Sequence, residues 1–97
     1  MLLVLSIINR GDQKGKLRIC LLDEAENDYL ASSPEYGAAP HMEEYVEDSY
    51  NVKHPLIAEC KTGCRYVVEI ISGGGGGHSL TVTGFQFSAS PCLKKKM

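Results

Sequence analysis

The residues that could do chemistry in this 97-residue chain are concentrated in one acidic segment, residues 23–48. The segment holds nine carboxylates and no lysine or arginine. Eight of the nine form two clusters, which are Asp23, Glu24, Glu26, Asp28 and Glu43, Glu44, Glu47, Asp48. A calcium ion (Ca2+) takes about six to eight oxygen ligands, many of them carboxylates, so both clusters are candidate metal ligands. The spacing is not that of an EF-hand loop, so the ligands would have to converge from two parts of the segment.

The second cluster is also a candidate protein-binding surface. An acidic segment in solvent raises solubility and attracts basic partners. The residues predicted to bind such a partner are Glu43, Glu44, Glu47 and Asp48. On the sequence alone, calcium ligation and a solvated or partner-binding acidic segment both remain open.

Four cysteines and three histidines raise the hypothesis of thiol chemistry; they are Cys20, Cys60, Cys64, Cys92 and His41, His54, His78. A nucleophilic thiolate needs a neighbouring group that lowers its pKa, and no local motif ties a histidine to a cysteine. Cys60, Cys64 and His54 resemble half of a zinc site, but the second pair of ligands is missing,. Because no secretory signal is recognised, we expect a cytoplasmic protein with free thiols, and a local Cys60–Cys64 disulfide is the alternative.

The glycine run at residues 73–77 is a second candidate motif. A phosphate-binding glycine loop leads into a helix N-terminus and carries a lysine and a hydroxyl at fixed positions. Here the pattern that follows is that of a strand, Leu80 to Val82. The run is therefore predicted to be the tip of a hairpin.

Length and composition exclude several classes of protein. A 97-residue chain with 43% hydrophobic residues predicts one domain, residues 1–90, followed by a flexible tail, residues 91–97. A domain of this size has little room for an enclosed active site, which argues against a free-standing enzyme. The net charge of −2 lacks the basic footprint of a nucleic-acid binder,. No apolar run approaches the roughly 18 residues of a membrane span.

The elements that must position these residues are mostly strands. Alternation of apolar and polar residues, or β-branched runs, predicts strands over residues 1–8, 16–21, 66–71 and 80–87,. The apolar phase slips at Gly84, which predicts a β-bulge. A weaker strand is expected over residues 51–60, interrupted at Pro55, and a short helix over residues 41–48. The predicted architecture is mostly β: an antiparallel β-sandwich of C2-like or jelly-roll type with a long acidic loop at about residues 23–50,.

Three stretches together resemble the C2-like β-sandwich of calpain-family proteins, called calpain domain III. Residues 3–12 resemble its opening strand, a hydrophobic-Ser-hydrophobic run that leads into a polar turn. Residues 63–70, with Gly-x-x-Tyr, and the alternating residues 79–82 resemble its closing hairpin. The sequence departs from the family at Ile71-Ser72-Gly73, where a Pro-Ser-Thr often stands. The resemblance implies a non-catalytic module whose acidic residues serve calcium-linked switching, approach to phospholipid or contact with a neighbouring domain.

The function predicted from the sequence is therefore a regulatory or binding module without catalytic residues. Calcium, or a basic protein partner or neighbouring domain, would neutralise the acidic segment and change what it contacts; a peripheral phospholipid surface is a further expected partner, and nucleic acid is not. Two other classes stay open. One is a small Cys-His enzyme. The other is a purely structural subunit, which predicts an exposed apolar patch at an unpaired sheet edge and an oligomer.

Overall fold

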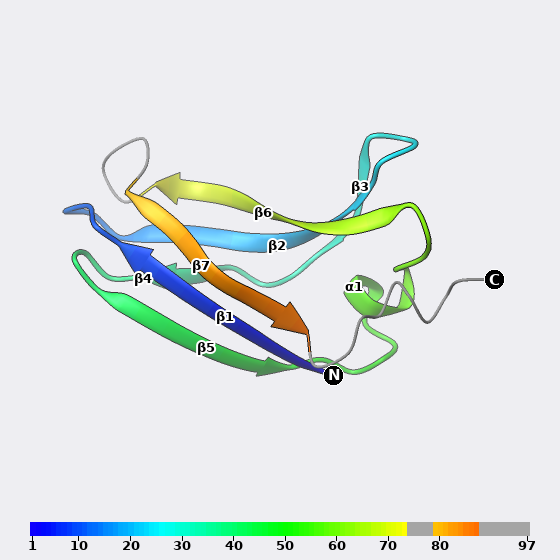
Figure 1. Cartoon of the computed structure of the whole chain (residues 1–97), viewed down its shortest axis with the longest axis horizontal. Coiled ribbons are helices and arrows are strands. Elements are labelled where there is room, and N and C mark those ends of the chain that lie inside the picture. Colours follow the sequence, from blue (N-terminus) through cyan, green and yellow to red (C-terminus); the bar gives the residue numbers. More distant parts are fainter. Residues whose placement is uncertain (74–78, 88–97) are drawn as a thin grey trace.

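The computed structural model describes residues 1–73 and 79–87 and folds them into two antiparallel sheets (Figure 1). The strands are β1 (Leu2–Asn9), β2 (Gly15–Asp23), β3 (Asp28–Ser32), β4 (Tyr36–Ala38), β5 (Glu43–Ser49), β6 (Cys64–Gly73) and β7 (Leu80–Phe87), with one short helix, α1 (Pro55–Ala58). One sheet has the order β5-β1-β7. In the other, β2 pairs with β6 on one side and with β3 and β4, one after the other, on the opposite side. The mostly β, antiparallel fold predicted from the sequence is confirmed.

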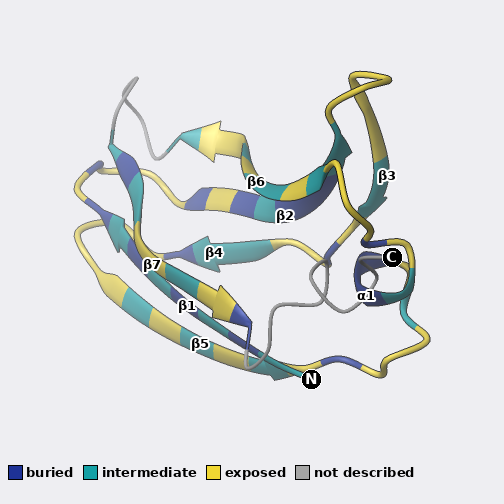
Figure 2. Cartoon of the chain, turned by 45° about the vertical axis from the view of Figure 1, so that its right-hand side comes forward, coloured by how far each residue is buried: buried dark blue, intermediate teal, exposed yellow. Residues whose placement is uncertain are grey.

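The core lies between the two central strands, β1 and β2. Alternate residues of a strand point to opposite faces of its sheet, and the inward row of β1 is Leu3, Leu5 and Ile7. The inward row of β2 is Leu17, Ile19 and Leu21. All six side chains are buried. Figure 2 shows the same contrast, with buried residues along β1 and β2 and exposed residues along the outer strands β5 and β6.

The predicted bulge in the last strand is confirmed. The register between β1 and β7 shifts between Ser6 and Ile7, whose partners are Gly84 and Val82, so Thr83 is the extra residue. A bulge changes which residues of a strand face the core. Val82 therefore packs on the core before the shift, and Phe85 and Phe87 after it.

The hairpin predicted between the last two strands is wrong. β6 pairs with β2, and β7 pairs with β1, so the chain passes from one sheet to the other between residues 73 and 80. Most of the glycine run, residues 74–77, lies outside the described residues. A glycine-rich connection accepts many backbone conformations, and it therefore carries no information about which strands its two flanks pair with.

The acidic segment is not a long loop, because it contains β3, β4 and β5. The helix predicted over residues 41–48 is wrong: this stretch holds a turn and most of β5, which pairs with β1 in register from Leu2 with Ser49 to Ile8 with Glu43. The strand predicted over residues 51–60 is wrong as well. Pro55 begins α1, and the His54 Nδ1 atom accepts a hydrogen bond from the Leu56 backbone N–H at 3.0 Å, which caps the helix,.

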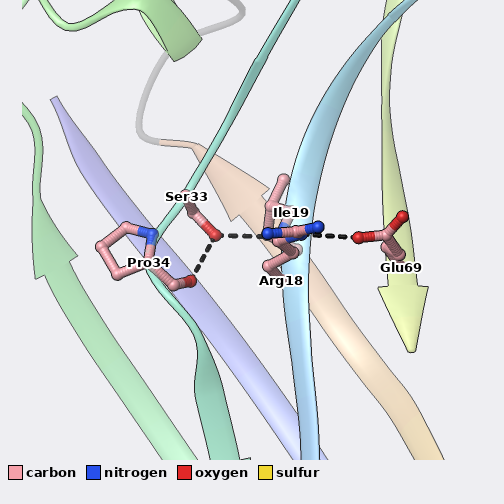
Figure 3. Close-up of polar contacts among 5 residues, drawn as sticks. All are labelled: Arg18, Ile19, Ser33, Pro34 and Glu69. Carbon is pink, nitrogen blue, oxygen red and sulfur yellow. Dashed lines mark hydrogen bonds and ion pairs between the residues drawn. The ribbon is translucent and has the colours of Figure 1, made fainter. Parts of the chain in front are cut away.

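Two buried polar side chains join the strands. Ser33 stands where β3 has ended and β4 has not begun, and its hydroxyl accepts from the Ile19 N–H at 2.9 Å and donates to the Pro34 carbonyl at 2.8 Å (Figure 3). Asn9, at the end of β1, donates to the carbonyls of Gln13 and Ala38. Buried backbone groups need hydrogen-bond partners. Ser33 supplies one to the Ile19 N–H of β2, in the gap between β3 and β4, and Asn9 supplies one to the Gln13 carbonyl in the β1–β2 turn.

Candidate functional site

The candidate functional sites are two of the open sheet edges, those of β5 and β6. Within residues 1–73 and 79–87, β5 pairs as a strand only with β1, and β6 only with β2. An open edge presents backbone N–H and C=O groups that can pair with another chain. The side chains along each edge then decide what kind of chain is accepted.

The edge strand β5 carries the second acidic cluster. Its register with β1 places Glu43, Tyr45 and Glu47 on the outer face, opposite Ile8, Ser6 and Val4. Glu44 and Asp48 lie on the inner face, on the same side as the buried row of β1. Glu43, Tyr45 and Glu47 are exposed, and Glu44 and Asp48 are half-buried. All four acidic residues predicted to bind a partner are thus brought together on one open strand.

A tyrosine pair holds this strand to the other sheet, and sequence reasoning missed it. The Tyr36 hydroxyl, on β4, donates to Asp48 Oδ2 at 2.6 Å and shares a short hydrogen bond with the Tyr50 hydroxyl. Burial raises the pKa of Tyr36 far above its usual range, and the hydrogen bond to Asp48 raises it further. Burial also raises the pKa of Tyr50. Tyr36 is therefore a neutral donor at physiological pH, and Asp48 accepts its hydrogen bond.

The first acidic cluster lies elsewhere, on the turn between β2 and β3. Asp23 Oδ1 accepts from the Ala25 N–H at 3.1 Å, which closes the turn, and Glu24 forms an ion pair with Arg65 Nε at 3.0 Å. In Figure 1 this turn lies at the upper right of the molecule, and β5 runs along its lower edge. In the part of the chain that the structure describes, no group of three or more His, Cys, Asp or Glu residues is arranged to hold a metal ion. The two clusters are not brought together, and calcium binding stays a prediction.

The cysteines are not all thiols, contrary to the expectation. Cys60 is disulfide-bonded, and its partner is neither Cys20 nor Cys64, both of which are free. The alternative of a Cys60–Cys64 disulfide is therefore wrong too. Burial raises the pKa of Cys20, and the charge of Glu69 raises it further. A raised pKa keeps this thiol protonated, the opposite of what a nucleophile needs.

The histidines give no described cysteine a base. His54 caps α1 through Nδ1, and its ring packs edge-on against Tyr50. His41 lines a shallow hollow of about 350 Å³ at one end of β1 with Arg10, Met42 and Glu43. His78 and Cys92 lie outside the described residues. The described residues thus offer nothing in favour of the Cys-His enzyme.

Comparison with other proteins adds no neighbour: no protein-family model, no curated protein and no solved structure matches this chain. The resemblance to calpain domain III therefore stays a prediction. None of the described helices is long and apolar enough to cross a membrane. The described residues form a small antiparallel β-sandwich in which the open edges of β5 and β6 differ in chemistry.

Proposed function

We propose that this chain is a non-catalytic binding module that takes up a basic, extended segment of a protein partner along the open edge of β5. The observation that carries the proposal is that four carboxylates and an open backbone edge coincide on one strand. Addition of a strand to a sheet edge is a common mode of peptide recognition, in which the backbone supplies affinity and alternate side chains supply specificity.

The alternating side chains of β5 predict the sequence pattern of the partner segment. Residues directly opposite each other on paired strands point to the same face. Lysine or arginine at alternate positions of the added strand would therefore meet Glu43 and Glu47 on the exposed outer face. The same carboxylates repel a second copy of β5, since like charges facing each other are unfavourable. The edge thus favours a basic segment over its own copy.

Calcium and a phospholipid surface would act on the same carboxylates of β5. Calcium bound at Glu43 and Glu47 would neutralise the edge and compete with the basic segment. An anionic phospholipid surface would be repelled by β5 and would approach only when calcium reduces that charge. This is the calcium-linked response that the resemblance to calpain domain III implies, located on a single strand.

The test is a titration with a fluorescent synthetic peptide of alternating lysine and threonine, followed by anisotropy. Binding is expected, and the double variant Glu43→Gln/Glu47→Gln should weaken it by at least about tenfold, which is about 1.4 kcal/mol. The matched control is Glu24→Gln/Glu26→Gln, which removes the same charge from the β2–β3 turn and should change the affinity little.

A second peptide separates strand addition from simple charge attraction. It keeps the lysines and replaces the threonines with proline, which cannot donate a backbone hydrogen bond to an edge. Equal binding of both peptides, or equal weakening by the two pairs of substitutions, would show that the β5 edge is not the docking site. Repeating the titration with calcium tests the competition directly.

A further inference from the structure

The open edge of β6 has a different surface from that of β5. Three aliphatic side chains of β6 are exposed: Val68 (38%), Ile70 (47%) and Ile71 (42%). Soluble proteins usually protect an open edge with charges, proline or a very short strand. β6 has ten residues, and only Arg65 and Glu69 are charged. An exposed apolar edge of this kind is a surface for pairing.

The register of β6 on β2 shows on which face each side chain lies. Tyr66, Val68 and Ile70 stand opposite Leu21, Ile19 and Leu17, the buried row of β2, so they share its inner face. Tyr66 packs on the core, but Val68 and Ile70 are exposed although they belong to the same row. The apolar inner surface of this sheet therefore continues onto β6 without being covered along the whole strand.

The outer row of β6 carries the charges. Arg65, Val67 and Glu69 stand opposite Leu22, Cys20 and Arg18. Glu69 Oε1 forms an ion pair with Arg18 Nε at 2.5 Å, drawn in Figure 3. Arg65 forms the ion pair with Glu24 described above. Arg65 and Glu69 lie two residues on either side of Val67, and they have opposite charges.

We propose that β6 pairs antiparallel with β6 of a second copy of this chain, about a two-fold axis at Val67. In this register Arg65 faces the partner's Glu69, and Glu69 faces the partner's Arg65, so two pairs of opposite charge form on the outer face. On the inner face, Val68 is covered by the partner's Tyr66, and Ile70 by the partner's Cys64. Aromatic side chains facing β-branched ones, and opposite charges facing each other, are the stabilising pairs of antiparallel strands.

Charge complementarity selects this register over its neighbours. An axis at Val68 places Glu69 opposite the partner's Val67 and leaves both charges without a partner across the axis. An axis at Glu69 places two carboxylates opposite each other, which is unfavourable. Only the axis at Val67 joins the existing ion pairs into one row, in which Glu24, Arg65, the partner's Glu69 and the partner's Arg18 alternate in charge.

The dimer should be weak and reversible. One pair of strands buries less surface than the roughly 1,200 Å² or more of a stable interface. Association is therefore expected to depend on protein concentration. A two-fold axis makes the contact use the same patch on both copies, so the assembly closes as a dimer and does not grow.

The first test is sedimentation equilibrium of the full chain over a range of concentrations, with Val68→Lys and its matched control Val52→Lys. Val52 is 64% exposed and lies outside every strand and helix of the described residues. The wild-type chain and Val52→Lys should dimerise, and Val68→Lys should raise the dissociation constant at least about tenfold. A wild-type chain that stays monomeric at every concentration, or a Val68→Lys chain that dimerises as the wild type does, would overturn the proposal.

The second test uses charge reversal to check the register. In Arg65→Glu alone, and in Glu69→Arg alone, every cross-strand pair has like charges, so each variant should be monomeric. An equimolar mixture of the two variants places a glutamate opposite an arginine at both positions and should restore the dimer. Circular dichroism of each variant verifies that it is folded. Failure of two folded variants to associate when mixed would rule out the axis at Val67.

Discussion

β5 and β6 are both edge strands whose backbone groups could pair with another chain. They differ in the side chains that they carry. β5 has four carboxylates in seven residues, whereas β6 has three exposed aliphatic side chains and a single pair of opposite charges. A uniformly charged edge repels its own copy and attracts a chain of opposite charge. An apolar edge with charges placed symmetrically about its centre accepts its own copy. One sandwich can therefore present two edges of different chemistry.

The two strands also differ in how they are held. β5 is paired with β1 and tied to the other sheet through the Tyr36–Asp48 hydrogen bond. β6 is paired along nearly its whole length with β2, and the Tyr66 hydroxyl donates to the Leu56 carbonyl at 2.7 Å. The acidic edge therefore depends on a polar contact between sheets, and the apolar edge on its strand pairing and on aromatic packing.

The largest effect is expected from the core residue beneath the acidic edge. Leu5 is fully buried and pairs with Val46 of β5, so Leu5→Ala should lower the free energy of unfolding by about 2–5 kcal/mol. Urea denaturation measures the loss. A loss below about 1 kcal/mol would show that the packing of Leu5 in the core does not stabilise the pairing of β1 with β5.

A smaller loss is expected from the tie between the sheets. Tyr36→Phe removes the donor to Asp48 and the acceptor for the Tyr50 hydroxyl, and it should cost about 1–3 kcal/mol,. Tyr45→Phe is the matched control, because Tyr45 is exposed and its hydroxyl contacts only Glu47, at 3.2 Å; it should change stability by less than about 0.5 kcal/mol. Equal effects of the two substitutions in urea denaturation would contradict the role given to Tyr36.

Tyr66, beneath β6, should contribute to the alkaline limit of stability together with Tyr36 and Tyr50. Burial raises the pKa of Tyr66 to about 12, with a further contribution from Cys64. The pKa in the unfolded chain is about 10. The raised pKa adds stability that is fully present below about pH 10 and is lost as the pH rises toward 12. Thermal melts across this range should show less pH dependence for Tyr66→Phe than for the wild type; an unchanged slope would show that Tyr66 does not contribute.

The smallest effect on folding is expected from Arg65→Ala. Its ion pair with Glu24 joins two side chains that are each 56% exposed, and such pairs contribute about 0–1 kcal/mol. The same substitution should weaken the dimer, because it removes both charge pairs across the axis. Urea denaturation at low concentration and sedimentation at high concentration separate the two effects. A large loss of monomer stability with unchanged dimerisation would show that Arg65 stabilises the fold and not the dimer.

The strands with clear alternation could be predicted from the sequence, since Leu17, Ile19 and Leu21 mark one face of β2 without reference to any other strand. The bulge at Gly84 could be predicted for the same reason. The partners of β6 and β7 could not, because pairing depends on contacts distant in sequence, which a glycine run does not encode. β5 was mistaken for a helix because four carboxylates in six residues obscure the alternation that its pairing with β1 reveals.

Part of the candidate site was likewise predictable. The residues Glu43, Glu44, Glu47 and Asp48 were predicted as one partner-binding group, and the structure places them on one strand. The structure separates these residues from the first cluster because β3 and β4 lie between the two in the chain. The order of charges in the sequence does not predict this separation. The Tyr36–Asp48 contact joins two sheets and has only a weak local signal, a tyrosine on either side of the acidic residues. The apolar edge of β6 was anticipated only in general terms, as the patch that a structural subunit would expose.

Amide hydrogen exchange, followed residue by residue by NMR, tests whether the two edges bind different chains. Raising the protein concentration should slow exchange along β6 and leave β5 unchanged, because self-association covers only the apolar edge. Adding the lysine-threonine peptide at low protein concentration should slow exchange along β5 and leave β6 unchanged. Protection of the same edge in both experiments, or of neither edge, would show that β5 and β6 do not bind different chains.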